Sequence, residues 1–211
     1  GFNIRKACVW FPDGTEQLIL TGVAPNLGGQ GEVLGFSFDG TYATGGAEWI
    51  SGLGAFRWDA VNGPEYLGEL PGSYGARGVA ISEDGKTVIG NSGPNGTLDS
   101  AWIWTEQDGM RSVDQVVADL GLAFPLGGEA FYVSDMTPDG RVIVGAFNSG
   151  FGTADEAFRL TLPEPCGFTE YGAGASSANV LALSGTGATD VGTTPTLVTT
   201  GATSPNVIYA L

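Results

Sequence analysis

The chain has 211 residues, of which 36 are glycine, 11 are proline and none is histidine, and its formal net charge is −15. Without histidine it cannot form a Ser-His-Asp triad, a Cys-His pair or a His-ligated zinc site. Its 23 acidic residues against 8 basic ones leave no basic stripe for nucleic acid and repel anionic membranes. We therefore expect neither a nucleic-acid partner nor membrane insertion.

A short apolar strand recurs along the chain at intervals of 46 to 56 residues. Its copies are Ala7-Cys8-Val9-Trp10, Ala55-Phe56-Arg57-Trp58, Ala101-Trp102-Ile103-Trp104 and Ala157-Phe158-Arg159-Leu160. An Asp-Gly turn lies between successive copies, at Phe38-Asp39-Gly40, Glu83-Asp84-Gly85 and Pro138-Asp139-Gly140. Because Asp-Gly between β-branched runs is a strong hairpin signal, each turn predicts two antiparallel strands.

The second repeat shows the content of one unit most clearly. Strands are predicted at residues 56–58, 65–68, 78–82 and 87–90, separated by Gly, Pro and Asn turns. Four strands in a repeat of about 46 residues is the content of one propeller blade. We expect an all-β, propeller-like array of about three four-stranded blades over residues 1–162, with units of about 7–54, 55–100 and 101–162.

The third unit is longer because it holds a predicted helix. Ser112 and Gln115 have the spacing of a capping box, and Gly121 follows as a helix stop. We expect a short helix over residues 112–120 that covers an exposed blade edge.

A different composition begins at residues 163–211, which open with two prolines in three residues. This C-terminal segment contains no Lys or Arg and is rich in Gly, Ala, Ser and Thr. Low-complexity disorder is one interpretation. Alternating β-branched runs near residues 180–183, 196–200 and 206–211 instead favour strands, which are too few for an independent core. Such strands would dock on the propeller, on a neighbouring subunit or on sequence outside the printed chain.

Residues 5–162 resemble the bacterial extracellular repeat known as the HAF family. The match rests on Ala55-Phe56-Arg57-Trp58, Leu67-Gly68-Glu69-Leu70-Pro71-Gly72 and the segment 79–90, whereas Gly45-Gly46-Ala47 departs from the family's Val-Val-Gly strand. The resemblance implies an exported β-propeller-like protein and carries no catalytic residues. Tyr171-Gly172-Ala173-Gly174 is similar to Gly-rich C-terminal β modules of secreted bacterial proteins.

The recurring aspartates Asp39, Asp84 and Asp139 have two interpretations. Carboxylates at these positions would suit a glycosidase pair or a structural Ca²⁺ site. Their recurrence at the same place in every unit favours a turn role, because Asp before Gly suits the turn backbone. No loop has the EF-hand pattern, so we expect no catalytic residue, no metal ligand and no cofactor, with structural Ca²⁺ as the alternative.

The aromatic residues divide by their place in the repeat. Trp10, Trp58 and Trp104 share one repeat position, which predicts packing between blades. The residues outside this register are the candidates for glycan contacts: Trp49, Trp102, Tyr66, Tyr74 and Tyr132. Cys8 and Cys166 lie at opposite ends of the repeat region and are a candidate disulfide pair in an exported protein.

The leading functional hypothesis is a secreted, non-enzymatic structural or adhesive protein at the cell surface or outside the cell. It would assemble through its C-terminal strands into an extracellular oligomer or filament. The alternatives are a glycan-binding, lectin-like propeller module and, third, a carboxylate-based glycoside hydrolase. Three units are too few to close a ring of about 4–8 blades. The missing blades would come from a longer protein or from further chains, unless the units stack openly.

Overall fold

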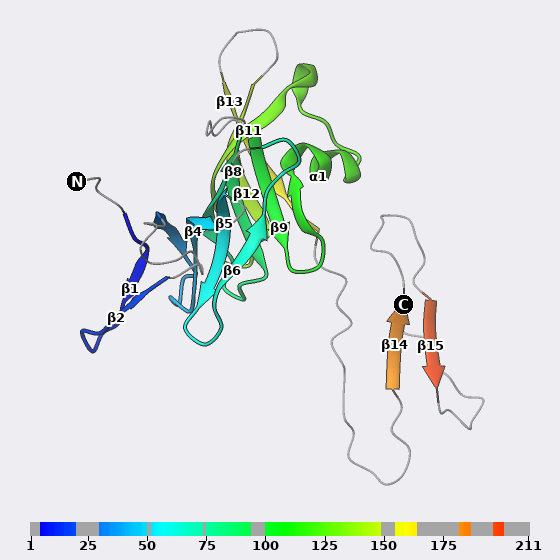
Figure 1. Ribbon diagram of the computed structural model, residues 1–211. Coiled ribbons are helices and arrows are strands. Elements are labelled where there is room, and N and C mark those ends of the chain that lie inside the picture. Colours follow the sequence, from blue (N-terminus) through cyan, green and yellow to red (C-terminus); the bar gives the residue numbers. More distant parts are fainter. Residues whose placement is uncertain are drawn as a thin grey trace. The chain divides into compact units, whose positions relative to one another are not determined.

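Figure 1 shows a computed structural model of the chain, which forms two compact units, Gly1–Leu162 and Pro163–Leu211. The structure describes residues 5–19, 30–49, 52–73, 75–93, 100–148, 155–163, 182–186 and 196–200. In the described part of the chain, no helix is long and apolar enough to cross a membrane.

The first unit consists of antiparallel sheets whose strands follow one another in chain order. The N-terminal hairpin contains β1 (Cys8–Trp10) and β2 (Glu16–Leu18). Blade 1 contains β3 (Gly31–Phe36), β4 (Tyr42–Trp49), β5 (Gly52–Asp59) and β6 (Gly63–Gly68). Blade 2 contains β7 (Ala76–Ile81), β8 (Thr87–Ser92), β9 (Ser100–Thr105) and β10 (Gly109–Ser112). Blade 3 contains β11 (Glu129–Met136), β12 (Val142–Asn148) and β13 (Glu156–Thr161).

This arrangement confirms the predicted all-β, propeller-like fold. The first strands of successive blades lie side by side, since β3 contacts β7 and β7 contacts β11. The repeated Ala-x-x-Trp segment forms the third strand of a blade, as in β5 and β9. The sheets therefore divide the repeat at a different point from the sequence units 7–54, 55–100 and 101–162.

A glycine in the second strand of each blade is required by a bulge in the first strand. The ladders shift register between Val33 and Gly35 in blade 1, and at the matching points of β7 and β11. A Cβ on the facing glycine would collide with a first-strand carbonyl in every blade, as for Gly45 against Glu32, Gly90 against Arg77 and Gly145 against Tyr132. Only glycine fits this close approach of two backbones.

The register also corrects the alignment of the first repeat. Gly45 pairs with Phe56, just as Gly90 pairs with Trp102 and Gly145 pairs with Phe158. The segment that corresponds to Val-Val-Gly is therefore Ala43-Thr44-Gly45, not Gly45-Gly46-Ala47. The first repeat keeps the glycine that the sheet needs.

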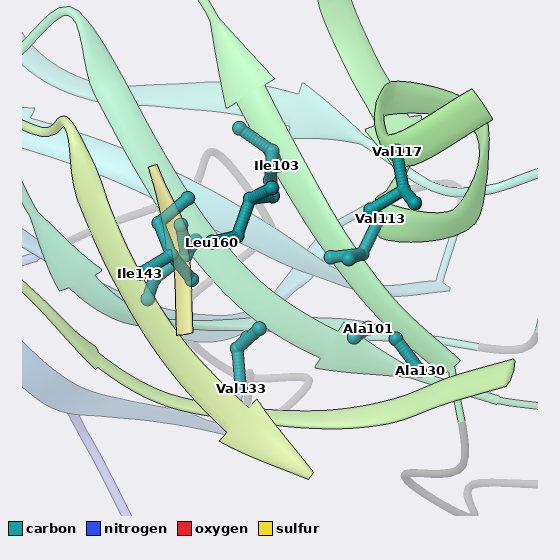
Figure 2. Packing of buried hydrophobic residues seen from close by; sticks show 9 residues of the cluster. Ala101, Ile103, Val113, Val117, Ala130, Val133, Ile143 and Leu160 are labelled. Atoms are coloured by element: carbon teal, nitrogen blue, oxygen red, sulfur yellow. The ribbon is translucent and has the colours of Figure 1, made fainter. Parts of the chain in front are cut away.

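Hydrophobic side chains fill the space between successive sheets. Blade 1 and blade 2 share a cluster that includes Ala55, Val88 and Trp102. Blade 2 and blade 3 share another, in which Ile103 from β9 faces side chains from the next sheet and from the helix (Figure 2). Its buried members are Ile89, Ala101, Ile103, Val113, Val117, Ala130, Val133, Ile143 and Leu160.

A buried side chain also connects blade 2 to blade 3. The Asn91 side-chain amide donates to the Val133 carbonyl at 3.0 Å and accepts from the Val133 N–H at 2.8 Å. Nearer the turns, the Glu83 N–H donates to the Pro138 carbonyl at 2.7 Å. The two Asn91 bonds satisfy backbone groups in the bulged strand β11, where the ladder is irregular.

The predicted helix at residues 112–120 is confirmed as α1 (Val113–Asp119). The Ser112 hydroxyl accepts from the Gln115 N–H and the Gln115 side chain accepts from the Ser112 N–H, each at 3.1 Å. Val113 and Val117 are buried in the cluster between blades 2 and 3. A 3₁₀ turn, η3 (Pro125–Gly127), follows the helix and leads into β11.

The second unit contains one described sheet, the antiparallel pair β14 (Ala182–Thr186) and β15 (Thr196–Thr200). These strands overlap two of the three predicted for this segment. The strand predicted at residues 206–211 lies outside the described residues.

The glycine opposite the bulge provides a test of the fold. We expect Gly90→Ala to lower the free energy of unfolding by about 3 kcal/mol, because the new methyl group meets the Arg77 carbonyl and the Trp102 ring. Gly31→Ala is the matched control, since its Cβ would lie 3.3 Å from the Ala7 Cβ and needs only a small adjustment. Urea unfolding of both variants measures the difference. Equal losses would contradict the proposed close approach.

Candidate functional site

The three Asp-Gly turns have the same hydrogen-bonding pattern. In each, the carboxylate accepts from the hydroxyl two residues before it and from the N–H two residues after it. That hydroxyl oxygen in turn accepts the N–H of the residue that opens the second strand, at 2.9–3.0 Å. The glycine has a positive φ every time: 75° at Gly40, 69° at Gly85 and 72° at Gly140.

These bonds stabilise the charged form of the turn carboxylates. The hydroxyl and N–H of Thr41 hold the pKa of Asp39 below its usual value, and the hydroxyl of Thr137 does the same for Asp139. Burial raises the pKa of Asp84, but hydrogen bonds from Ser82 and Lys86 outweigh it, so this pKa is lowered too. A general acid needs the opposite shift at neutral pH, so these carboxylates suit turns better than catalysis.

One carboxyl group has the opposite shift. Burial raises the pKa of Asp114 above its usual value, and the nearby charge of Glu129 adds to this. Asp114 lies in the first turn of α1 and accepts from the Ala130 N–H at 3.0 Å, which ties the helix to β11. In the described part of the chain, no three Cys, Asp or Glu side chains gather as metal ligands do.

The tryptophans of the repeat differ in burial. Trp58 and Trp104 are buried between sheets, as their shared position predicts. Trp102 is also fully buried and packs with Val88 in the cluster between blades 1 and 2. A glycan therefore has no access to its ring, which corrects the prediction of Trp102 as a candidate glycan contact. Trp10 departs from the prediction as well, since 66% of it is exposed.

Two of the glycan candidates lie against each other on blade 1. The rings of Trp49 on β4 and Tyr66 on β6 have centroids 5.1 Å apart, and Tyr66 occupies the space that a side chain on Gly54 would fill. Tyr66 is 37% exposed, and its hydroxyl donates to Glu69 at 3.0 Å. Tyr132 is 41% exposed but belongs to β11 in blade 3. Tyr74 lies outside the described residues.

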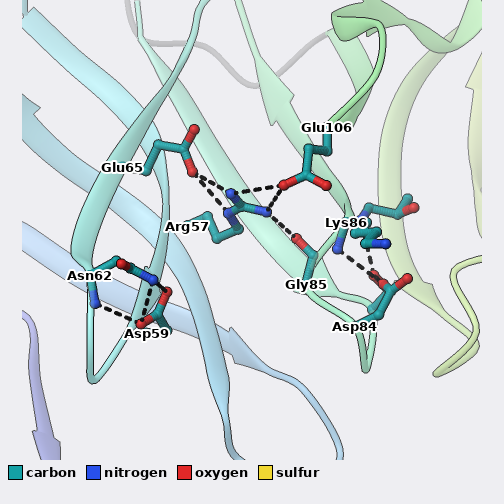
Figure 3. Close-up of polar contacts among 10 residues, drawn as sticks. Arg57, Asp59, Asn62, Glu65, Asp84, Gly85, Lys86 and Glu106 are labelled. Atoms are coloured by element: carbon teal, nitrogen blue, oxygen red, sulfur yellow. Dashed lines mark hydrogen bonds and ion pairs between the residues drawn. The ribbon is translucent and has the colours of Figure 1, made fainter.

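Arg57 on β5 connects blade 1 to blade 2 through several groups at once (Figure 3). It donates to Glu65 of its own blade at 2.6 and 2.9 Å, and to the Gly85 carbonyl of blade 2 at 3.0 Å. Glu106 lies 3.4 Å from the same guanidinium, whose carbon lies 5.1 Å from the centre of the Trp104 ring. One arginine therefore combines ion pairing, backbone capping and stacking at a blade joint.

A small pocket lies at the start of the first strands. Glu32 on β3 pairs with Arg5 and with Arg77 on β7, each at 2.9 Å. The pocket beside these ion pairs measures about 60 Å³, whereas small-molecule sites usually measure roughly 300–1,000 Å³. The ion pairs therefore serve the packing of blade 1 against its neighbours.

The free surface of blade 3 is the clearest departure from the repeat. Ladder register places Val144, Ala146, Ala157 and Arg159 at the positions that Ile89, Asn91, Ala101 and Ile103 occupy in blade 2. The four residues of blade 2 are buried under blade 3. In blade 3, Val144, Ala157 and Arg159 are exposed. We call this surface, with Val144, Ala146, Ala157 and Arg159, the C-face.

The N-terminal hairpin has a matching open surface. Val9 and Ile19 pack on blade 1, so the alternate residues of β1 and β2 point away from it. Trp10 pairs with Glu16 across the hairpin, and Cys8 pairs with Leu18. We call this surface, with Cys8, Trp10, Glu16 and Leu18, the N-face. Cys8 is partly buried and Cys166 lies outside the described residues, so their disulfide stays a prediction.

Fold and surfaces together define a propeller-like protein whose described sheets leave the N-face and the C-face exposed. Comparisons with solved structures found TolB proteins. A TolB-type protein from Agrobacterium tumefaciens has a TM-score of 0.39 and 18% identity, over 70% of this chain and 54% of that one. TolB from Acinetobacter baumannii has a TM-score of 0.41 and 17% identity, over 75% of this chain and 41% of that one. This chain spans about half the length of those proteins or less.

No protein-family model and no curated protein sequence matches the chain. The resemblance to the HAF repeat therefore stays a prediction.

The turn carboxylates predict a loss of stability in acid. Because their pKa values are lower in the folded chain than the usual 3.8, the folded state binds fewer protons than the unfolded state in this range. Their stabilisation is complete above about pH 4 and is lost as the pH falls through the folded pKa values. Melting temperatures from pH 7 to pH 2.5 should therefore fall steeply below pH 4. The triple variant D39N, D84N and D139N should show a shallower fall, and an unchanged slope would contradict the assignment.

Proposed function

We propose that the chain is a non-enzymatic structural module of an exported, cell-surface or extracellular protein, and that it assembles with neighbouring subunits. The observation that carries the proposal is the C-face, where blade 3 exposes the positions that blade 2 buries. When a neighbouring subunit covers an exposed sheet surface with apolar side chains, the free energy of the assembly falls. Export is supported by the resemblance to the extracellular HAF repeat.

The non-enzymatic part of the proposal is supported by the use of the polar residues. Each turn aspartate has its donors within its own turn, and the ion pairs of Arg57 and Glu32 lie at blade joints. Asp114 has the raised pKa of a general acid, but its carboxylate binds the backbone of β11. These residues are explained by packing and turns without a reaction.

The C-terminal strands supply a second means of assembly. Among the described residues, β14 pairs with β15 alone, and an isolated two-stranded sheet is marginally stable in water. Both strands therefore have an edge whose backbone groups can pair with a strand of another subunit. We assign this hairpin to strand addition between neighbouring chains.

A proline in β15 tests this assignment. We expect wild-type protein to sediment as assemblies and Val198→Pro to sediment as smaller species, because proline removes a backbone donor and disfavours the ladder. Val198→Thr is the matched control, since it keeps the N–H and the β-branched shape, and it should assemble like wild type. Sedimentation velocity over a concentration series measures the outcome. Wild-type protein that stays monomeric at all concentrations would overturn the proposed function.

A second candidate function is glycan binding by the aromatic pair of blade 1. The observation that favours it is the contact of Trp49 with the partly exposed ring of Tyr66, beside the carboxylate of Glu69. Aromatic faces next to hydrogen-bonding groups suit sugar rings, which have an apolar face and polar edges. On this alternative the protein is a lectin-like module.

A glycan array with wild-type protein and Tyr66→Ala tests this alternative. Binding that weakens about tenfold in Tyr66→Ala would support it, since one aromatic contact is worth about 1.4 kcal/mol or more. Phe38→Ala removes a 90% exposed aromatic residue elsewhere on blade 1 and is the control. An array without binding, or equal loss in both variants, would exclude the pair as a glycan site.

A further inference from the structure

We propose that the C-face of one chain binds the N-face of a second copy, with Arg159 stacked on Trp10 of that copy. The inference rests on the proposed function and identifies one of its joints. It makes the end-to-end contact between copies a repetition of the contact between blades within a chain.

The blade 1–blade 2 joint is the template for this contact. Arg57 on the outward side of blade 1 lies over the Trp104 ring on the facing side of blade 2, with 5.1 Å between guanidinium carbon and ring centre. The same guanidinium pairs with carboxylates of both blades. The joint therefore matches an arginine on one sheet to a tryptophan on the next.

The repeat places the same two residue types at the two ends of the array. Arg159 pairs with Val144 on blade 3, as Arg57 pairs with Thr44 on blade 1. Trp10 closes the strand Ala7-Cys8-Val9-Trp10, at the repeat position of Trp104. Arg159 thus corresponds to the arginine of the template, and Trp10 corresponds to its tryptophan.

Exposure separates these two residues from their equivalents. Trp10 is 66% exposed, whereas Trp104 is buried under Arg57 and its neighbours. Arg159 is exposed, whereas the Arg57 side chain is 18% exposed. Among the described residues of the first unit, no further sheet covers Trp10 or Arg159 in the way that a neighbouring blade covers Trp104 and Arg57.

The charges at the two faces are complementary. Glu16 pairs with Trp10 across the N-face hairpin and supplies a carboxylate for Arg159, as Glu106 of blade 2 does for Arg57. The C-face presents the arginine among the small or β-branched residues Val144, Ala146 and Ala157. A second copy offers the tryptophan and the carboxylate together, whereas residues 163–211 contain no tryptophan.

The contact joins two different surfaces, so a dimer keeps one free N-face on one copy and one free C-face on the other. Such a heterologous interface closes into a ring if the rotation between copies permits, and otherwise continues as a filament. Either form supplies the blades that three sheets alone lack.

The test uses Val198→Pro as the background, so that strand addition by β15 is weakened and the blade joint is measured by itself. We expect Val198→Pro protein to associate in a concentration-dependent manner. Adding Trp10→Glu or Arg159→Glu should weaken association about tenfold or more, which corresponds to the loss of a stacked and charged contact. Mixing the two variants should restore a dimer and nothing larger, because one intact N-face then meets one intact C-face.

Controls are available on the same sheets. Phe38→Glu changes an exposed aromatic residue in the blade 1 turn, and Lys86→Glu changes an exposed base in the blade 2 turn. Both should associate like the background, and all variants should keep its melting temperature. Sedimentation velocity and mass photometry of each protein provide the comparison.

Two results of the single proteins, and one of their mixture, would overturn the joint while leaving assembly intact. One is a Val198→Pro background that stays monomeric while wild type assembles. The other is association that neither Trp10→Glu nor Arg159→Glu changes, which would place the contact elsewhere. A mixture of the two variants without a dimer would show a symmetric contact and would also refute the proposal. Wild-type protein that never assembles would refute the proposed function itself.

Discussion

The blades depend on one close contact, in which the bulged first strand brings a carbonyl against the second strand of the same sheet. Gly45, Gly90 and Gly145 have no side chain to obstruct it. The bulge increases the local twist of the sheet, and twisted sheets are the form that stacks around an axis in a propeller. The blades therefore need this glycine in order to stack. The turn residues and the core residues then stabilise a sheet whose twist the glycine permits.

Around this contact, each blade presents two different faces. One face receives the large ring or aliphatic side chain of the third strand, and the other presents smaller residues and, in blades 1 and 3, an arginine. Because each blade contacts its two neighbours through opposite faces, the same contact can be repeated by any number of blades. Among the described residues, the N-terminal hairpin leaves one kind of surface exposed, with Trp10, and blade 3 leaves the other kind exposed, with Val144, Ala157 and Arg159.

Much of the fold could be predicted from the sequence, because its repeat combines period, turn and strand signals. The Asp-Gly hairpins and the capping box of α1 are local patterns, and the structure has both. Burial was harder to predict. Trp102 lies two residues before Trp104, so both side chains are on the same face of the strand. Repeat position alone separated the two tryptophans and did not indicate this shared burial. Trp10 is exposed because its burial needs a neighbouring sheet. A local sequence pattern does not indicate whether such a sheet is present.

The two joints of the array use different forces. Blades 2 and 3 are connected by the Asn91 bonds, by a turn-to-turn backbone bond and by an apolar cluster that includes α1. Blades 1 and 2 add the charged groups of Arg57 and Arg77 to their apolar contacts. Dissolved salt screens partly exposed charges but leaves apolar packing intact. A rise in ionic strength therefore weakens the charged contacts of the first joint, while the apolar clusters of both joints remain.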